Sequence, residues 1–72
     1  MDRVLLVEDE PSLQLALGDC LEDEGYSVTV AGTVADALEA LRTDSPDLVL
    51  CDLRLPDGSG MQILAAVAPS SP

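Results

Sequence analysis

Three carboxylates directly follow two apolar segments of strand length, and their positions suit them to metal binding or phosphoryl transfer. Glu8 and Asp9 follow the apolar residues 4–7, and Asp52 follows the apolar residues 48–51. If the two segments are neighbouring parallel strands, the three carboxylates meet at the carboxyl edge of one sheet, where open α/β sheets bind their ligands. Carboxylate oxygens suit a hard divalent cation such as Mg²⁺. One of them could then accept a phosphoryl group, because aspartate is an established nucleophile in such reactions.

A metal site of this kind would need further oxygen ligands. Asp9 and Asp52 could bind Mg²⁺ directly and Glu8 through a water molecule, since Mg²⁺ in proteins usually keeps several waters. A backbone carbonyl in the loop after Asp52 could supply another ligand. Acidic residues at strand ends are also often only helix caps or solvated loop residues, so the residues alone leave a purely structural role open.

Other phosphate or metal sites fit the sequence poorly. Arg54 stands where the Asp-x-Asp motif of a haloacid-dehalogenase-type phosphatase needs its second aspartate, and an EF-hand loop fails at the same residue. No glycine-rich segment ends in Gly-Lys, which excludes a P-loop.

The elements that must position these carboxylates alternate along the chain. Short apolar runs predict three strands, and apolar residues at helical spacing predict a helix after each. Pro11 suits the first turn of the first helix, Gly25 its end, and Thr33 the N-cap of the second helix. The predicted elements are strands at 3–8, 27–31 and 47–51, a second helix ending near Arg42, a loop over 52–59, and a third helix from Ser59 or Gly60 to about Val67.

This alternation predicts an α/β fold with a parallel sheet. Right-handed crossovers limit its arrangement, and strand order 2-1-3 puts the first helix on one face and the other two helices on the opposite face. The first strand is then central and buried on both faces, which agrees with its unbroken hydrophobicity.

Composition limits the partners. The 72 residues carry a net charge of −11, with three arginines and no lysine or histidine, so direct binding to nucleic acid or to an anionic membrane is not expected. Cys20 and Cys51 lie in apolar stretches and are predicted to be buried rather than paired. The chain opens without a signal peptide and has no apolar segment of membrane-spanning length, which favours a cytoplasmic protein.

Two segments resemble parts of the response-regulator receiver domain, the CheY-like fold. Residues 5–11, Leu-Leu-Val-Glu-Asp-Glu-Pro, are similar to its opening, and residues 46–60, which include Cys-Asp-Leu-Arg-Leu-Pro-Asp-Gly-Ser-Gly, are similar to its phosphoacceptor strand and loop. The resemblance implies a flavodoxin-like three-layer α/β sandwich with sheet order 2-1-3, truncated to the N-terminal portion of the domain. Residues 1–68 would form this partial receiver, and residues 69–72 a disordered tail.

The resemblance also implies roles for individual residues. It makes Asp52 the phosphoacceptor, with Mg²⁺ as the cofactor. The implied metal ligands are Glu8, Asp9, Asp52 and the backbone carbonyl of Arg54. Pro56 would fix the loop, and Gly60 would let the third helix begin close beneath it. The implied phosphodonor is a sensor histidine kinase or a phosphotransfer protein, and self-phosphorylation is the most enzyme-like activity expected.

The sequence differs from a full receiver domain, which has five strands. The hydroxyl residue that the family carries on its fourth strand and the lysine on its fifth have no counterpart among these 72 residues. The third strand of this chain would become an exposed edge, so we expect self-association through that strand or through the first helix. Three interpretations stay open: a truncated receiver that is phosphorylated on Asp52, a receiver remnant that acts as an unphosphorylated interaction or dimerisation module, and an inert fragment of a longer transcriptional regulator.

Overall fold

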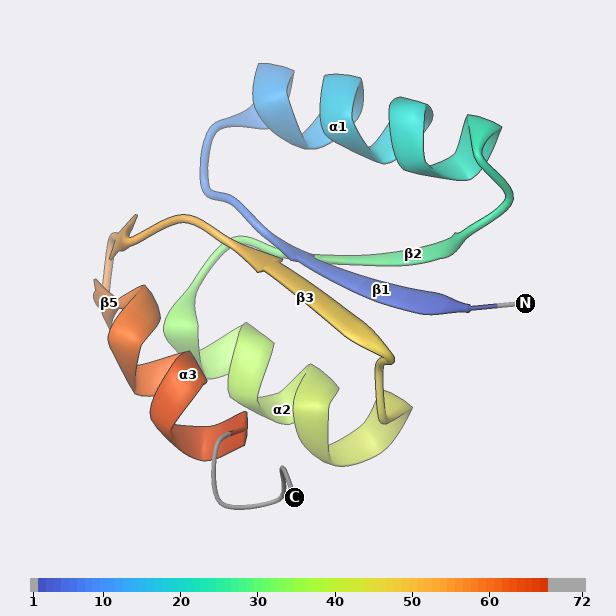
Figure 1. Cartoon of the computed structure of the whole chain (residues 1–72). Helices are drawn as coiled ribbons and strands as arrows, with labels where there is room; N and C mark the ends of the chain where they lie inside the picture. The colour runs from blue at the N-terminus through green and yellow to red at the C-terminus, as the bar shows by residue number, and fades with distance from the viewer. Residues whose placement is uncertain (1, 68–72) are drawn as a thin grey trace.

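A parallel sheet of three strands organises the fold in the computed structural model, which describes residues 2–67 and the side chains of residues 2–63. The strands are β1 (Arg3–Val7), β2 (Ser27–Ala31) and β3 (Leu48–Cys51). They pair in the order β2-β1-β3, as predicted (Figure 1). The predicted tail at 69–72 lies outside the described residues.

Helices cover both faces of the sheet. They are α1 (Pro11–Asp23), α2 (Val34–Asp44) and α3 (Gly60–Val67). Helix α1 lies on one face, and α2 and α3 lie together on the other (Figure 1). This confirms the predicted three-layer α/β arrangement, although α2 runs past the predicted end near Arg42. No helix in the described part of the chain is long and apolar enough to cross a membrane.

Local sequence signals set the ends of the first two helices. Pro11 is the first residue of α1, and Gly25 follows the helix with φ +94°, a conformation that glycine adopts without steric cost. Thr33 caps α2 as predicted, because its side chain accepts a hydrogen bond from the backbone N–H of Asp36 at 3.1 Å. Ser45 ends α2 in the left-handed region, with φ 49°.

The core forms where β1 meets α2 and α3. Residues 4–7 of β1 are each only 1–2% exposed, so the central strand is buried on both faces as predicted. Leu5 and Val7 point toward α2 and α3, where they pack with Val34, Ala37 and other members of the main cluster. Alternation along the strand sends Leu6 to the opposite face. This aliphatic core fixes the position of β1, and so of the carboxyl edge of the sheet where Glu8 follows the strand.

The face of α1 and the outer edge of β3 are much less covered. Leu13 and Leu17 of α1 are 47% and 39% exposed, and Leu50 of β3 is 38% exposed. The prediction that Cys20 and Cys51 are buried is wrong, since both are exposed. Cys51 ends the edge strand β3, with which no other described strand pairs on its outer side, and Cys20 lies on the sparsely covered helix α1.

A short hairpin occupies the segment that was predicted to be a loop. Strands β4 (Arg54–Leu55) and β5 (Gly58–Ser59) pair antiparallel, with Arg54 opposite Ser59 and Leu55 opposite Gly58. Leu55 is 8% exposed and belongs to the main cluster. This buried side chain anchors the hairpin to the body of the domain.

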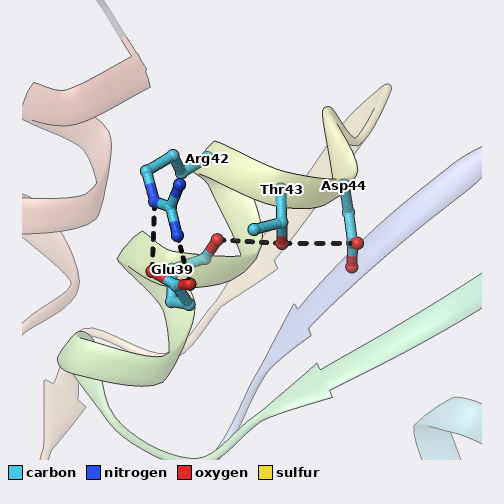
Figure 2. Close-up of polar contacts among 4 residues, drawn as sticks. All are labelled: Glu39, Arg42, Thr43 and Asp44. Atoms are coloured by element: carbon cyan, nitrogen blue, oxygen red, sulfur yellow. Dashed lines mark hydrogen bonds and ion pairs between the residues drawn. The ribbon is translucent and has the colours of Figure 1, made fainter.

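Polar contacts at the far end of α2 occupy two of the three arginines. Arg42 forms an ion pair with Glu39, and Thr43 bridges the Glu39 carbonyl and the Asp44 carboxylate (Figure 2). Arg3 donates from Nη1 to the carbonyl of Asp44 at 2.9 Å. Because Arg3 begins β1 while Glu8 follows its end, these cations lie away from the carboxylate edge. Arg54 is therefore the one arginine placed beside that edge.

Candidate metal centre

The carboxyl ends of β1 and β3 bring the three predicted carboxylates together. Val7 lies opposite Cys51 in the parallel register, so the next residues of both strands leave the sheet at the same edge. The backbone N–H of Asp52 still donates to the Val7 carbonyl at 3.0 Å, which holds the two strand ends side by side. One carboxylate oxygen from each of Glu8, Asp9 and Asp52 lies within 4.8 Å of the others. The predicted meeting of these three residues is confirmed.

Glu8 is the most constrained of the three. It is only 8% exposed, and its Oε1 accepts a hydrogen bond from the backbone N–H of Glu10 at 3.1 Å. Its backbone carbonyl accepts a hydrogen bond from the side-chain amide of Gln14 on α1. Apart from the helical position of Gln14 one turn after the loop, no feature of the sequence predicts this contact.

Asp52 and Asp9 keep carboxylate oxygens available. The backbone N–H of Arg54 donates to Asp52 Oδ1 at 3.3 Å, a long contact that orients the carboxylate. Within residues 2–63, no hydrogen bond engages Asp52 Oδ2 or the carboxylate of Asp9. Asp9 is exposed and Asp52 is half-buried. These free oxygens face a position that a ligand could reach.

The donor set fits a divalent cation bound through oxygen. Three carboxylates converge, and the ion pair between Glu39 and Arg42 is the only one found among the described residues. Among the residues whose side chains are described, no arginine forms an ion pair with any of the three clustered carboxylates. One or two direct carboxylate ligands with retained waters is the usual coordination of protein-bound Mg²⁺. The donors at this edge match that pattern.

The start of α3 lies directly beneath the site. Gly60 is buried, and its N–H donates to the carbonyl of Leu53 at 3.0 Å. A Cβ atom at Gly60 would collide with the backbone carbonyl of Asp52 and would lie 3.0 Å from Cys51 Sγ. Only glycine permits this close approach. Pro56, the other residue expected to shape the loop, lies exposed between β4 and β5.

The thiol of Cys51 lies beside Asp52. Although the residue is exposed overall, partial desolvation of the thiol, followed by the charges of Asp52 and Glu8, raises the pKa of Cys51. Its Sγ donates to the carbonyl of Asp52 at 3.0 Å. The raised pKa disfavours the thiolate, which is the form of cysteine that binds metals.

A hollow opens beside the carboxylates on the α1 face of the sheet. Its volume is about 500 Å³. Its lining combines apolar residues from three elements with two of the carboxylates: Leu6, Val7, Glu8, Leu13, Leu17, Leu50, Cys51 and Asp52. This hollow gives solvent and small solutes access to Asp52 from the side of α1.

Asp57 links the loop after Asp52 to α2, a role that was not predicted from the sequence. Its Oδ1 accepts from the N–H of Val34 at 2.7 Å and its Oδ2 from the N–H of Ala35 at 3.1 Å. These hydrogen bonds lower the pKa of the Asp57 carboxyl. Asp-Gly after proline indicates a turn. No sequence signal identifies donors 23 and 22 residues away.

Known proteins resemble this chain in sequence and in fold. The family profile described as "Response regulator receiver domain" matches residues 4–72. The alginate biosynthesis transcriptional regulatory protein AlgB of Pseudomonas putida is 41% identical over 70 residues, and the transcriptional regulatory protein GlrR of Escherichia coli is 42% identical over 70 residues. Each alignment covers 97% of this chain and 16% of the relative. The chain therefore spans about a sixth of the length of these relatives.

Solved structures of receiver domains have the same fold as this chain. The receiver domain of HemR from Leptospira biflexa, in non-phosphorylated form, superposes with a TM-score of 0.89 at 39% identity, covering 96% of this chain and 56% of the other. TrrA of Thermotoga maritima, solved in complex with Mg²⁺ and BeF, gives a TM-score of 0.91 at 31% identity and covers 99% of this chain and 62% of the other. By its family match, its relatives and its fold, this chain belongs to the response regulator receiver domains of two-component systems.

Proposed function

We propose that this chain accepts a phosphoryl group on Asp52 in a Mg²⁺-dependent reaction. The observation that carries the proposal is the convergence of Glu8, Asp9 and Asp52, with oxygens within 4.8 Å of one another and no protein cation paired to them among the described residues. The similarity to TrrA, which was solved with Mg²⁺ and BeF and separately with the histidine kinase ThkA, supports both the metal and the donor. The donor would be a phosphohistidine of a sensor kinase or phosphotransfer protein.

Asp52 and the backbone of Arg54 have distinct roles in the proposed phosphoryl transfer. The N–H of Arg54 holds Asp52 Oδ1, which leaves Oδ2 as the attacking oxygen. Oδ2 forms a bond to phosphorus while the P–N bond of the donor breaks, and the leaving imidazole keeps that electron pair and takes up a proton. The product is an acyl phosphate on Asp52. Mg²⁺, when bound, neutralises charge on the transferring phosphoryl group.

Four groups would hold the cation. Asp9 and Asp52 are the proposed direct carboxylate ligands, and the Arg54 carbonyl is the proposed backbone ligand. Glu8 would act through a water molecule, because its Oε1 already accepts from the N–H of Glu10. This division keeps the protein ligands few, as Mg²⁺ sites usually do.

Intact-mass spectrometry tests the proposal. The chain is incubated with Mg²⁺ and acetyl phosphate, and one added phosphoryl group is expected. Asp52→Asn should stay unmodified, while Asp36→Asn, which removes an equal charge from α2, should be modified like the native chain. No addition to a folded sample would contradict the proposal and favour the alternative of an unphosphorylated interaction module.

We further propose that the 72-residue chain self-associates. The edge strand β3 exposes Leu48 and Leu50 at 47% and 38%, and such apolar edges tend to pair with another chain. Light scattering over a range of concentrations should give a mass that rises with concentration, and Leu48→Lys should lower it because edge lysines oppose strand pairing. A concentration-independent monomer mass would overturn this proposal.

A further inference from the structure

The loop that follows Asp52 is fastened to a distant helix by a single carboxylate. Asp57 lies between β4 and β5, and both of its oxygens accept hydrogen bonds from the first two N–H groups of α2, at 2.7 Å from Val34 and 3.1 Å from Ala35. A carboxylate at a helix N-terminus also interacts favourably with the helix dipole. The contact joins two parts of the chain that are more than twenty residues apart.

Steric packing brings the same two segments together independently of these hydrogen bonds. A Cβ atom at Gly58 would lie 3.2 Å from Val34 Cγ2, so the backbone of β5 rests against the first residue of α2. Leu55 of β4 shares the main apolar cluster with Val34. These contacts hold the hairpin against the start of α2.

The helix does not depend on Asp57 alone for its cap. Thr33 already occupies the N-cap, and its hydroxyl accepts from the N–H of Asp36. Asp57 reaches two earlier donors, those of Val34 and Ala35, which a single N-cap side chain leaves unpaired. Two caps therefore serve one helix end, and only the second one originates in the loop beside the carboxylates.

The hairpin connects Asp57 to two groups at the proposed metal site, the carbonyl of Arg54 and the carboxylate of Asp52. Arg54 lies opposite Ser59 in the two-residue ladder, so the position of its carbonyl is tied to the position of β5. The Arg54 N–H also orients Asp52 Oδ1. A displacement of the hairpin tip at Asp57 would shift both groups. Groups that orient metal ligands through hydrogen bonds commonly change metal affinity about 10- to 100-fold when removed.

We propose that Asp57 is a positioning residue, which couples the metal-binding loop to the N-terminus of α2. The proposal rests on the proposed function of the Glu8, Asp9 and Asp52 cluster as a Mg²⁺ site. Asp57 touches neither the cation nor the phosphoryl group, and acts through the peptide of Arg54. By reciprocity, cation binding at the edge of the sheet must strengthen the contacts of Asp57 with α2 by the same factor that those contacts strengthen cation binding.

The test is a titration of the full 72-residue chain with Mg²⁺ alone, followed by amide signals in nuclear magnetic resonance spectra. In the native chain, Mg²⁺ should slow hydrogen exchange at the amides of Val34 and Ala35. Asp57→Asn should bind Mg²⁺ about 10-fold more weakly, at the low end of such effects because Asp57 is exposed. It should also lose the Mg²⁺-dependent protection of the two amides.

Matched variants separate coupling from a simple loss of helix capping or charge. Asp36→Asn removes one negative charge, as Asp57→Asn does, but from a residue in the first turn of α2 that makes no hydrogen bond to the hairpin. This variant should bind Mg²⁺ like the native chain. Asp57→Ala should bind Mg²⁺ more weakly than Asp57→Asn does, because the asparagine side chain retains one acceptor oxygen. Unchanged Mg²⁺ affinity in both Asp57 variants, with displaced Val34 and Ala35 signals and an otherwise native spectrum, would overturn the proposal.

Failure of the underlying site has a different signature. If Asp52→Asn bound Mg²⁺ as well as the native chain, the cluster would not be the metal site, and the proposed function and the coupling would both be overturned. If Asp52→Asn lost binding while the Asp57 variants kept it, the metal site would stand and only the coupling would be overturned.

Discussion

Gly60 meets the backbone carbonyl of Asp52 at a distance that no other residue type could maintain. A Cβ atom at Gly60 would collide with that carbonyl and lie 3.2 Å from the Cα of Leu53. Two of the three nearest atoms, the Asp52 carbonyl oxygen and the Leu53 Cα, belong to the backbone, so they cannot move aside without displacing Asp52 itself. The start of α3 and the position of the proposed phosphoacceptor are therefore one structural feature.

Gly60→Ala should consequently lower both stability and Mg²⁺ affinity. Overpacking at a closely packed position typically costs about 1–3 kcal/mol, and the displaced backbone would carry Asp52 away from Asp9. Urea unfolding and Mg²⁺ titration measure the two effects. A buried helical glycine supplies the control: Gly18 has nothing within 4 Å of its Cβ position. Gly18→Ala should stabilise the chain by about 0.5–1 kcal/mol.

A Gly60→Ala protein with native stability and native Mg²⁺ affinity would contradict this argument. It would mean that α3 can shift away from the sheet edge without disturbing the carboxylates. Loss of stability with retained affinity would separate the two effects and place the strain in α3 alone.

Much of the fold could be predicted because its signals are local. The unbroken hydrophobicity of residues 4–7 marked a strand buried on both faces, and the structure places β1 at the centre of the sheet. Strand order then brought Glu8 and Asp52 to one edge without any knowledge of side-chain positions. Caps such as Thr33 are likewise encoded within one helical turn.

Features that depend on distant residues could not be predicted. Cys20 and Cys51 occupy apolar stretches, but their exposure depends on what covers α1 and β3 in space. The hairpin of β4 and β5 has strands of two residues each, too short for an alternation pattern. The partners of Asp57 lie on α2, and the relation between them arises only when the hairpin folds against Val34.

Neutralising one carboxylate should have opposite effects without and with metal. In the absence of Mg²⁺, Asp9→Asn removes a charge whose neighbours lie within 4.8 Å, and it should raise the free energy of unfolding by a few tenths to about 1 kcal/mol. In Mg²⁺ the native chain should gain stability in proportion to its binding, whereas the variant should gain much less. Thermal unfolding of both proteins, without and with Mg²⁺, measures the two stability changes.

The exposed Asp19 on α1 supplies the control for this prediction, since it lies outside the carboxylate cluster. Asp19→Asn should gain stability from Mg²⁺ as the native chain does. Equal Mg²⁺ stabilisation of the native chain and Asp9→Asn would exclude Asp9 from the metal site.

The contact between Asp57 and α2 should make stability depend on pH in a known direction. Hydrogen bonds from the N–H groups of Val34 and Ala35 lower the pKa of Asp57 in the folded chain below its ordinary value of 3.8. The folded state thus binds this proton less readily than the unfolded state, and the contact stabilises the fold fully at pH values above 3.8. The stabilisation is lost as pH falls through the folded-state pKa, because a protonated carboxyl accepts the two hydrogen bonds poorly.

Asp57→Asn should therefore be less stable than the native chain at neutral pH, and this difference should shrink as the pH falls below 3.8. Urea unfolding at a series of pH values gives the difference directly, with Asp36→Asn as the charge-matched control. A stability difference that stayed constant down to strongly acidic pH would show that Asp57 acts through its shape and not through its carboxylate.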